Sequence, residues 1–248
     1  MVRGIHTAAY AMIAERERLE VTANNIANSS TAGFRKDLIT FVQGREMQMF
    51  RAGDGSYPLP YVGALGTGSF VLGVSVSQAP GSLIYTGNPL DVAVLGDGYF
   101  ALSTPDGVRY TRNGAFSLDA QGRLVSQEGY TVFGREGVLR IEGEAEIGPD
   151  GQVMQGSTVV GWLAIYRFQD PSGLIKRGQT LFEPSAVSGP AVLTDGNVRV
   201  GFLESSNVNP MQEMVNLITI MRSYEACQRY LSVQDEMLSR AVNDVARV

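Results

Sequence analysis

A seven-residue repeat of apolar positions runs through the C-terminal part of the chain. Two rows of residues, three positions apart, make up the a and d positions of about four heptads, which is typical of a helix that packs against another helix. We call these rows the heptad face: Leu217, Tyr224, Leu231, Leu238 and Val245, with Ile220, Cys227, Gln234 and Ala241. Asn209 suits an N-cap, Pro210 the first helical position, and Gln212 completes a spacing similar to a capping box. The pattern predicts a helix over 210–245.

A weaker repeat of the same kind begins the chain. Its seven-residue row consists of Ile5, Met12, Leu19 and Ile26. Ala9 and Ala23 lie on a neighbouring row, where small side chains allow a partner helix to approach closely. The alternating charges of 15–20 are typical of a solvated helix face, and the turn residues between Asn28 and Gly33 end the helix. The two repeats predict that the terminal helices pack together or against other copies.

The middle of the chain has the composition of a β domain. All but one of the 29 glycines lie between Gly33 and Gly201, and glycine is costly inside helices. Turn dipeptides separate short runs of β-branched and aromatic residues, as in hairpins. The dipeptides are Asp54-Gly55, Asp97-Gly98, Asp106-Gly107, Asn113-Gly114, Asp150-Gly151 and Asp195-Gly196.

These patterns predict a mainly β fold with terminal α-helices that pair as a coiled-coil-like domain around an all-β middle domain. The expected strands include Leu90–Leu95, Tyr99–Leu102, Ala115–Leu118, Thr131–Phe133 and Val159–Phe168. The expected divisions are an N-terminal helix (1–32), an extended linker or small irregular subdomain (33–72), the all-β domain (73–201) and a C-terminal helix (202–248).

The composition of the chain argues against most catalytic, metal-binding and nucleic-acid-binding functions. The chain has 20 basic and 25 acidic residues, for a net charge of −5, and no basic stripe that would favour nucleic acid. His6 and Cys227 are its only histidine and cysteine, so no internal disulfide or Cys/His zinc cluster forms. We interpret Cys227 as a packing residue, and the Asp-Gly pairs lack the spacing of calcium loops. We therefore expect no catalytic residue, cofactor or metal.

The N-terminus resembles a signal peptide only superficially. Arg3 precedes an apolar run, Ala8–Ala14, but the run is short and charged residues follow it at once. Cleavage there would also cut the helical repeat that continues to Ile26. We expect an uncleaved structural helix, and no stretch approaches the roughly 18 apolar residues of a membrane span.

Three sets of segments, at both ends and in the middle of the chain, form a recognisable signature: 23–28, 31 and 33–35; 89–94, 96–100 and 110–114; and 203–209, 213–215, 224–225 and 235–238. Together they resemble one family, the flagellar basal-body rod and hook proteins. The resemblance implies a structural, non-enzymatic protein that the flagellar type III export apparatus exports unfolded, without signal cleavage. It implies helical assembly outside the cytoplasmic membrane, with copies of itself and with other rod and hook proteins. The terminal helices would form an inner tube and the β domain would face outward, with no membrane insertion and no nucleic acid.

Smaller features of the sequence indicate which member of the family this chain resembles most. Hook proteins usually carry an extra outer β domain, for which the middle of this chain leaves little room. The segment Thr86–Asp91 looks closer to proximal rod proteins, whereas the Gly/Pro-rich stretch between Phe34 and Leu72 is also compatible with the distal rod protein. We favour the proximal rod, with a distal rod or short hook-type protein as the alternative. A secreted β-rich carbohydrate-binding module or hydrolase is a remote alternative, and it would need a cleft with convergent carboxylates.

The expected assembly interface uses the two helical repeats and the asparagines near residue 25. The candidates are Ile5, Met12, Leu19, Asn24, Asn25, Ile26, Asn28, Leu217, Tyr224, Leu231 and Leu238. The asparagines either form a polar helix end or donate side-chain hydrogen bonds between subunits, as a buried Asn does in coiled coils.

Overall fold

The computed structural model describes residues 2–51, 60–66, 68–141, 143, 145–156 and 158–245. The chain divides into two compact units. One consists of Met1–Asn24, Leu38–Val74 and Met211–Val248, and the other of Asn25–Asp37 and Ser75–Pro210. The expected turn at Asp54-Gly55 lies outside the described residues.

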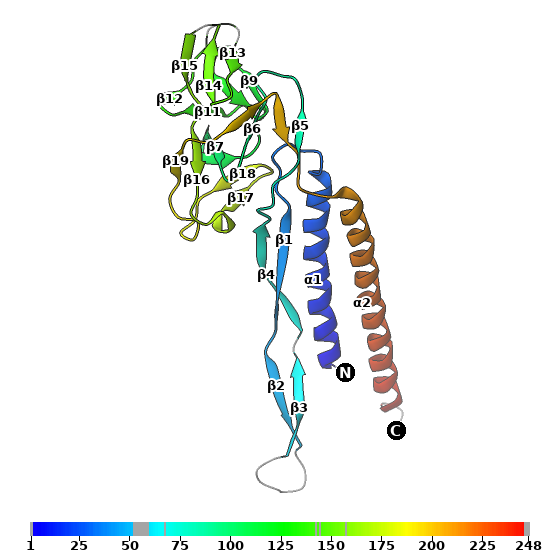
Figure 1. Cartoon of the computed structure of the whole chain (residues 1–248). Coiled ribbons are helices and arrows are strands. Elements are labelled where there is room, and N and C mark those ends of the chain that lie inside the picture. The colour runs from blue at the N-terminus through cyan, green and yellow to red at the C-terminus, as the bar shows by residue number, and fades with distance from the viewer. Residues whose placement is uncertain are drawn as a thin grey trace. The chain divides into compact units, whose positions relative to one another are not determined.

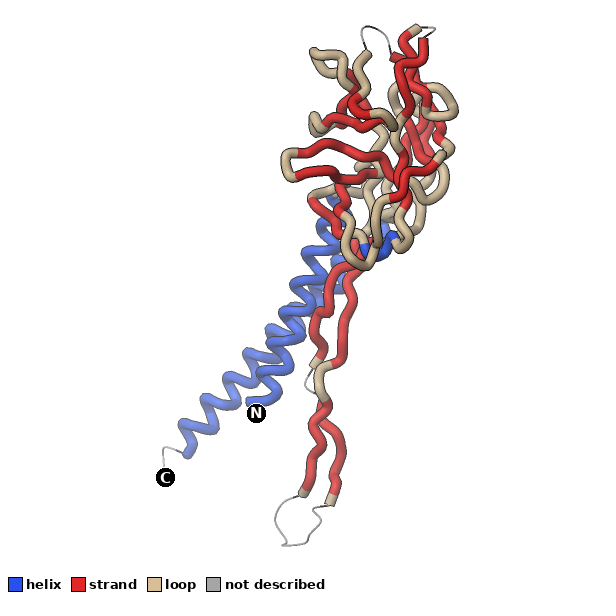
Figure 2. The backbone as a smooth tube through the Cα atoms, turned by 90° about the vertical axis from the view of Figure 1, so that its left-hand side faces the viewer, coloured by secondary structure: helices blue, strands red, loops and turns tan. Residues whose placement is uncertain are grey.

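Two long helices, α1 (Val2–Ala27) and α2 (Pro210–Val245), form the first unit together with a β ribbon. The helices run side by side in opposite directions (Figures 1 and 2). A Cβ on Gly4 of α1 would lie 2.8 Å from the Tyr230 hydroxyl of α2, so the helices are in close contact there. The predicted helix pair, the bounds of the second helix and the β-rich middle are all confirmed.

The ribbon occupies the segment for which we expected an extended linker or small irregular subdomain. Its strands are β1 (Asp37–Gln43), β2 (Glu46–Phe50), β3 (Tyr61–Gly66) and β4 (Ser69–Val76). Strand β1 pairs with β4, and β2 with β3. Every residue of β2 is exposed, and β1 and β4 have one buried residue each, Asp37 and Val76. The structure therefore differs from the sequence expectation at this segment.

The second unit contains the remaining strands and one 3₁₀ turn. They are β5 (Leu83–Tyr85), β6 (Val92–Val94), β7 (Tyr99–Thr104), β8 (Gly107–Thr111), β9 (Phe116–Leu118), β10 (Leu124–Ser126), β11 (Thr131–Gly134), β12 (Gly137–Val138), β13 (Ala145–Ile147), β14 (Gln152–Gln155), β15 (Thr158–Trp162), β16 (Ile165–Arg167), η1 (Pro171–Gly173), β17 (Ile175–Arg177), β18 (Leu181–Glu183), β19 (Val192–Thr194), β20 (Val198–Val200) and β21 (Phe202–Glu204). The largest sheet runs β17-β18-β8-β7-β11-β10-β9, with β12 on β11, β16 on β7 and β19 on β16. A smaller sheet runs β13-β14-β15, and the pairs β6–β20 and β5–β21 complete the unit.

The turn dipeptides mark hairpins at some positions and simple connections at others. Asp106-Gly107 joins the paired strands β7 and β8, and Asp150-Gly151 joins β13 and β14. Asp97-Gly98, Asn113-Gly114 and Asp195-Gly196 instead connect strands that do not pair with each other. Strand β6, for example, pairs with the distant β20 through Val94 and Val198. Local turn chemistry carries no information about such long-range partners.

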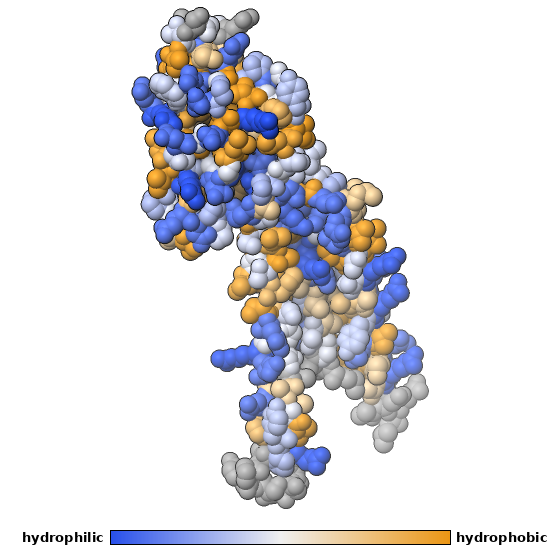
Figure 3. Space-filling model, viewed as in Figure 1, coloured by the Kyte–Doolittle hydropathy of each residue, from blue (hydrophilic) through white to orange (hydrophobic). Residues whose placement is uncertain are grey.

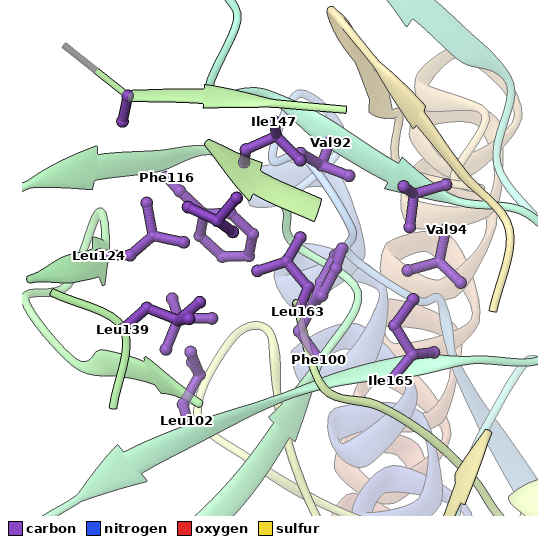
Figure 4. Packing of buried hydrophobic residues seen from close by; sticks show 14 of the residues in the cluster. Val92, Val94, Phe100, Leu102, Phe116, Leu124, Leu139, Ile147, Leu163 and Ile165 are labelled. Carbon is purple, nitrogen blue, oxygen red and sulfur yellow. The ribbon is translucent and has the colours of Figure 1, made fainter. Parts of the chain in front are cut away.

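The core of the second unit is a cluster of aliphatic residues around two phenylalanines (Figure 4). The rings of Phe100 and Phe116 meet edge to face, with centroids 5.0 Å apart. Leu102, Leu124 and Leu163 lie among the buried residues of the same cluster. This core is built from several strands, so its packing links the sheets of the unit.

We predict that Phe100→Ala destabilises the second unit by about 3–5 kcal/mol, because it removes a fully buried ring and leaves a cavity. Urea unfolding of the full chain, followed by fluorescence of the single tryptophan, Trp162, measures the loss. Val138→Ala, at an exposed position of the same unit, is the control and should change the unfolding free energy little. A loss at Phe100 as small as the control's would contradict the packing described here.

Candidate functional site

One side of α2 carries the heptad face. Every one of its described side chains, from Leu217 to Ala241, is buried or half-buried, and the residues between these rows are mostly exposed. The side chain of Val245 lies outside the described residues. The predicted heptad periodicity is therefore confirmed as the side of α2 that is turned away from solvent.

The opposite side of α2 begins with five exposed apolar residues that sequence reasoning overlooked. We call them the outer patch: Met211, Met214, Val215, Ile218 and Met221. Their exposed fractions lie between 46% and 74%, and Figure 3 shows hydrophobic side chains at the surface along the terminal helices. Their i, i+3, i+4 and i+7 spacing was a readable signal. Contiguous exposed apolar residues are typical of an interaction surface.

The structure divides the predicted interface candidates into three groups. The apolar ones (Ile5, Met12, Leu19, Ile26, Leu217, Tyr224, Leu231 and Leu238) are all half-buried. Asn24 is exposed, whereas Asn25 and Asn28 are buried. The Asn25 amide donates to the Asp37 carbonyl at 2.9 Å and accepts from the Asp37 N–H at 2.8 Å. Asn25 thus fastens the segment after α1 inside the chain, and a role of these residues between subunits stays a prediction.

A buried ion cluster lies in the second unit. We call Arg35, Arg112 and Glu204 the junction cluster. Their side chains are between 2% and 5% exposed. Arg35 Nη2 lies 2.8 Å from Glu204 Oε1, and Arg112 Nη1 lies 3.6 Å from Glu204 Oε2. Removal of one member would leave an uncompensated charge away from water.

Backbone groups add hydrogen bonds to Arg35 and Glu204. The Gly81 N–H donates to Glu204 Oε1 at 2.9 Å. Arg35 donates to the carbonyl of Gln78 at 3.1 Å and to that of Ala79. Asn207 accepts from the Lys36 N–H at 2.7 Å and donates to the Ala79 carbonyl at 2.7 Å. The segments that follow α1, precede β5 and precede α2 are therefore held to one another by side chains.

A second cation supports the segment after α1. Lys176 Nζ donates to the Arg35 carbonyl at 2.8 Å and to Asp37 Oδ1 at 2.9 Å. The same ammonium lies 3.6 Å from the centre of the Phe34 ring, within the range of a cation–π interaction. Burial lowers the pKa of Lys176, and the hydrogen bond to Asp37 opposes the shift. The ammonium is thus held by a carboxylate, a carbonyl and a ring.

Burial also dominates the electrostatics of the junction cluster. It lowers the pKa of Arg35; the Glu204 carboxylate opposes the shift, and the like charge of Arg112 adds to it. Burial raises the pKa of the Tyr99 phenol, whose ring lies 4.7 Å from the Arg112 guanidinium, although both arginines oppose that shift. The cluster therefore holds two cations and one carboxylate in a poorly solvated place.

Two glycines allow the backbone to approach closely around this cluster. Gly33 has φ +68°, and a Cβ there would lie 2.3 Å from the Asn113 backbone nitrogen. A Cβ on Gly81 would lie 1.8 Å from the Ser205 carbonyl oxygen. Any other residue at either position would push these segments apart.

Three family models match separate parts of the chain. "Flagella basal body rod protein" matches residues 5–35, "Flagellar hook protein FlgE/F/G D1 domain" matches 93–155, and "Flagellar basal body rod FlgEFG protein C-terminal" matches 199–244. Relatives align over nearly the whole chain. The flagellar basal-body rod protein FlgF of Caulobacter vibrioides is 33% identical over 94% of each chain. The rod protein FlgG of Bacillus subtilis is 34% identical over 98% of this chain and 99% of its own.

The chain belongs to the flagellar basal-body rod protein family. It is a structural rod subunit of the FlgF/FlgG type, and its family is non-enzymatic. Within the part of the chain that the structure describes, no group of His, Cys, Asp and Glu side chains could hold a metal ion. None of the described helices has an apolar stretch long enough to cross a membrane.

The junction cluster takes one residue from each of the three matched segments. Arg35 ends the first, Arg112 lies in the second and Glu204 in the third. All three residues lie in segments that carry the family resemblance, but nothing in the sequence indicated that they meet.

We predict that Glu204→Gln destabilises the second unit by about 3–5 kcal/mol, because two guanidinium groups remain buried without their carboxylate. Urea unfolding of the full chain measures the effect. Glu183→Gln is the control: its carboxylate bonds Arg177 at 2.7 Å but is more exposed, and its loss should be much smaller. Equal losses of unfolding free energy in the two variants would show that the buried junction cluster contributes no more to stability than an exposed ion pair.

Proposed function

We propose that the chain is a subunit of the proximal rod that assembles helically through its terminal helices, outside the cytoplasmic membrane. Its partners are copies of itself and other rod and hook proteins, and it reaches them through the flagellar type III export apparatus without signal cleavage. The outer patch of α2 carries the proposal, because it is apolar and exposed on one chain. Assembly would bury it.

One observation favours the proximal type. The segment Thr86–Asp91 resembles proximal rod proteins; in the structure it is a turn in which Asn88 Nδ2 donates to Asp91 Oδ1 at 3.0 Å. The relatives do not separate the two types, because FlgF of Caulobacter vibrioides and FlgG of Bacillus subtilis are 33% and 34% identical to this chain.

We further propose that the assembled rod transmits torque from motor to hook. The junction cluster ties three segments of the second unit to one another, which would stiffen that unit against load.

Deletion of the gene followed by electron microscopy of isolated basal bodies tests the assignment. A proximal subunit predicts basal bodies that lack the rod, including its distal part. A retained rod stub would point to the distal type, and a complete rod without a hook to a short hook-type protein. Intact basal bodies with normal swimming would contradict the rod function itself.

We predict that Ile218→Asp abolishes swimming and incorporation into the rod, because it places a charge in the outer patch. The isolated chain should keep its stability, since Ile218 is 52% exposed. Gln228→Asp, at an exposed polar position of α2, is the control and should assemble normally. Immunoblots of isolated basal bodies and thermal unfolding of the purified chain measure the two effects. Normal incorporation of Ile218→Asp would exclude the outer patch as the subunit contact.

A further inference from the structure

Methionine supplies three of the five residues of the outer patch: Met211, Met214 and Met221. Their exposed fractions are 74%, 48% and 46%, so solvent reaches these side chains on a single chain. At 3.6 residues per turn, the three lie within an arc of about 80° around α2. The surface that carries the proposed assembly contact is therefore also rich in thioether sulfur.

Other methionines of the chain provide an internal comparison. Met237, near the end of α2, is 50% exposed and lies outside the outer patch. Met12 of α1 and Met154 of β14 are half-buried. An oxidant must touch the sulfur to react with it, so the two half-buried methionines should react more slowly than those of the outer patch.

Oxygen transfer to sulfur is a reaction that the aliphatic members of the outer patch, Val215 and Ile218, do not undergo. A lone pair of the thioether sulfur attacks one oxygen of hydrogen peroxide. The S–O bond forms as the O–O bond breaks, and the second oxygen leaves as water. Sulfur loses two electrons and the peroxide gains them. The product, methionine sulfoxide, is polar, and its oxygen would have no hydrogen-bond donor within an apolar contact, which makes its burial costly.

We propose that the outer patch is an oxidation-sensitive site: hydrogen peroxide converts Met211, Met214 and Met221 of the unassembled chain to sulfoxides, and the oxidised chain does not enter the rod. This inference rests on the proposed assembly through the outer patch. Because assembly would cover the patch, sensitivity is confined to chains that have not yet assembled. Methionine sulfoxide reductases reverse the modification, so the oxidised chain is not permanently lost.

Peroxide footprinting of the full chain tests the chemistry. Mass spectrometry after timed exposure of the purified chain should find sulfoxide at the three methionines of the outer patch several-fold sooner than at Met12 and Met154. In isolated basal bodies, the same three should react several-fold more slowly than in the free chain. Equal rates at Met214 and Met12 in the free chain would overturn the site. Unchanged rates at the outer patch in basal bodies would overturn its protection by assembly.

Glutamine substitutions test the effect on assembly, because the glutamine side chain is polar and close in shape to methionine sulfoxide. Met214→Gln should reduce incorporation into isolated basal bodies several-fold. Met237→Gln is the matched control, with the same substitution on the same helix at an exposed fraction of 50% against 48%, and it should be incorporated like the unaltered chain. Thermal unfolding of the purified variants checks that both fold. Equal incorporation of the two variants, whether normal or reduced, would overturn the outer patch as the point where oxidation acts.

The footprint of the free chain requires neither a variant nor a rod. Failure of the rod assignment in the deletion strain is therefore distinguishable from failure of the oxidation site.

Discussion

The strictest constraint on this structure is the burial of two guanidinium groups and one carboxylate, the junction cluster, inside the second unit. The Glu204 carboxylate lies 2.8 Å from Arg35 Nη2 and also accepts a hydrogen bond from the Gly81 N–H. An ion cluster of this kind stabilises a fold only when its geometry is accurate, because the desolvation of each charge is costly. The residues around it must therefore hold their positions closely.

The surroundings of the junction cluster meet this requirement in several ways. Gly33 and Gly81 let backbone segments come within distances that a side chain would prevent. Asn25 and Asn207 use their amides to bond backbone groups of the adjoining segments. Packing, backbone hydrogen bonds and charge thus act on the same few segments. Asn25 and Gly33 lie in the first matched segment and Asn207 in the last, whereas Gly81 lies outside all three.

The sequence predicted the elements whose signals are local and periodic. The helix over 210–245 was correct because the heptad face repeats and Asn209 and Pro210 mark its start. The ribbon was missed because the glycines and prolines between Gly53 and Gly68 favoured an irregular segment. The junction cluster has no sequence period: Lys36 and Asn207, bonded across it, lie 171 residues apart. The spacing of the outer patch was visible in the sequence. It was overlooked because the heptad face, on the other side of α2, repeats more regularly.

A double-mutant cycle between Arg35 and Glu204 tests the central claim most directly. It compares the unfolding free energies of Arg35→Met, Glu204→Leu and the double variant with that of the unaltered chain. The account predicts that each single substitution costs several kcal/mol and that the double variant loses less than their sum, with a coupling of at least about 2 kcal/mol. Losses that add within about 0.5 kcal/mol would show that the two charges stabilise the fold independently, and would contradict the account.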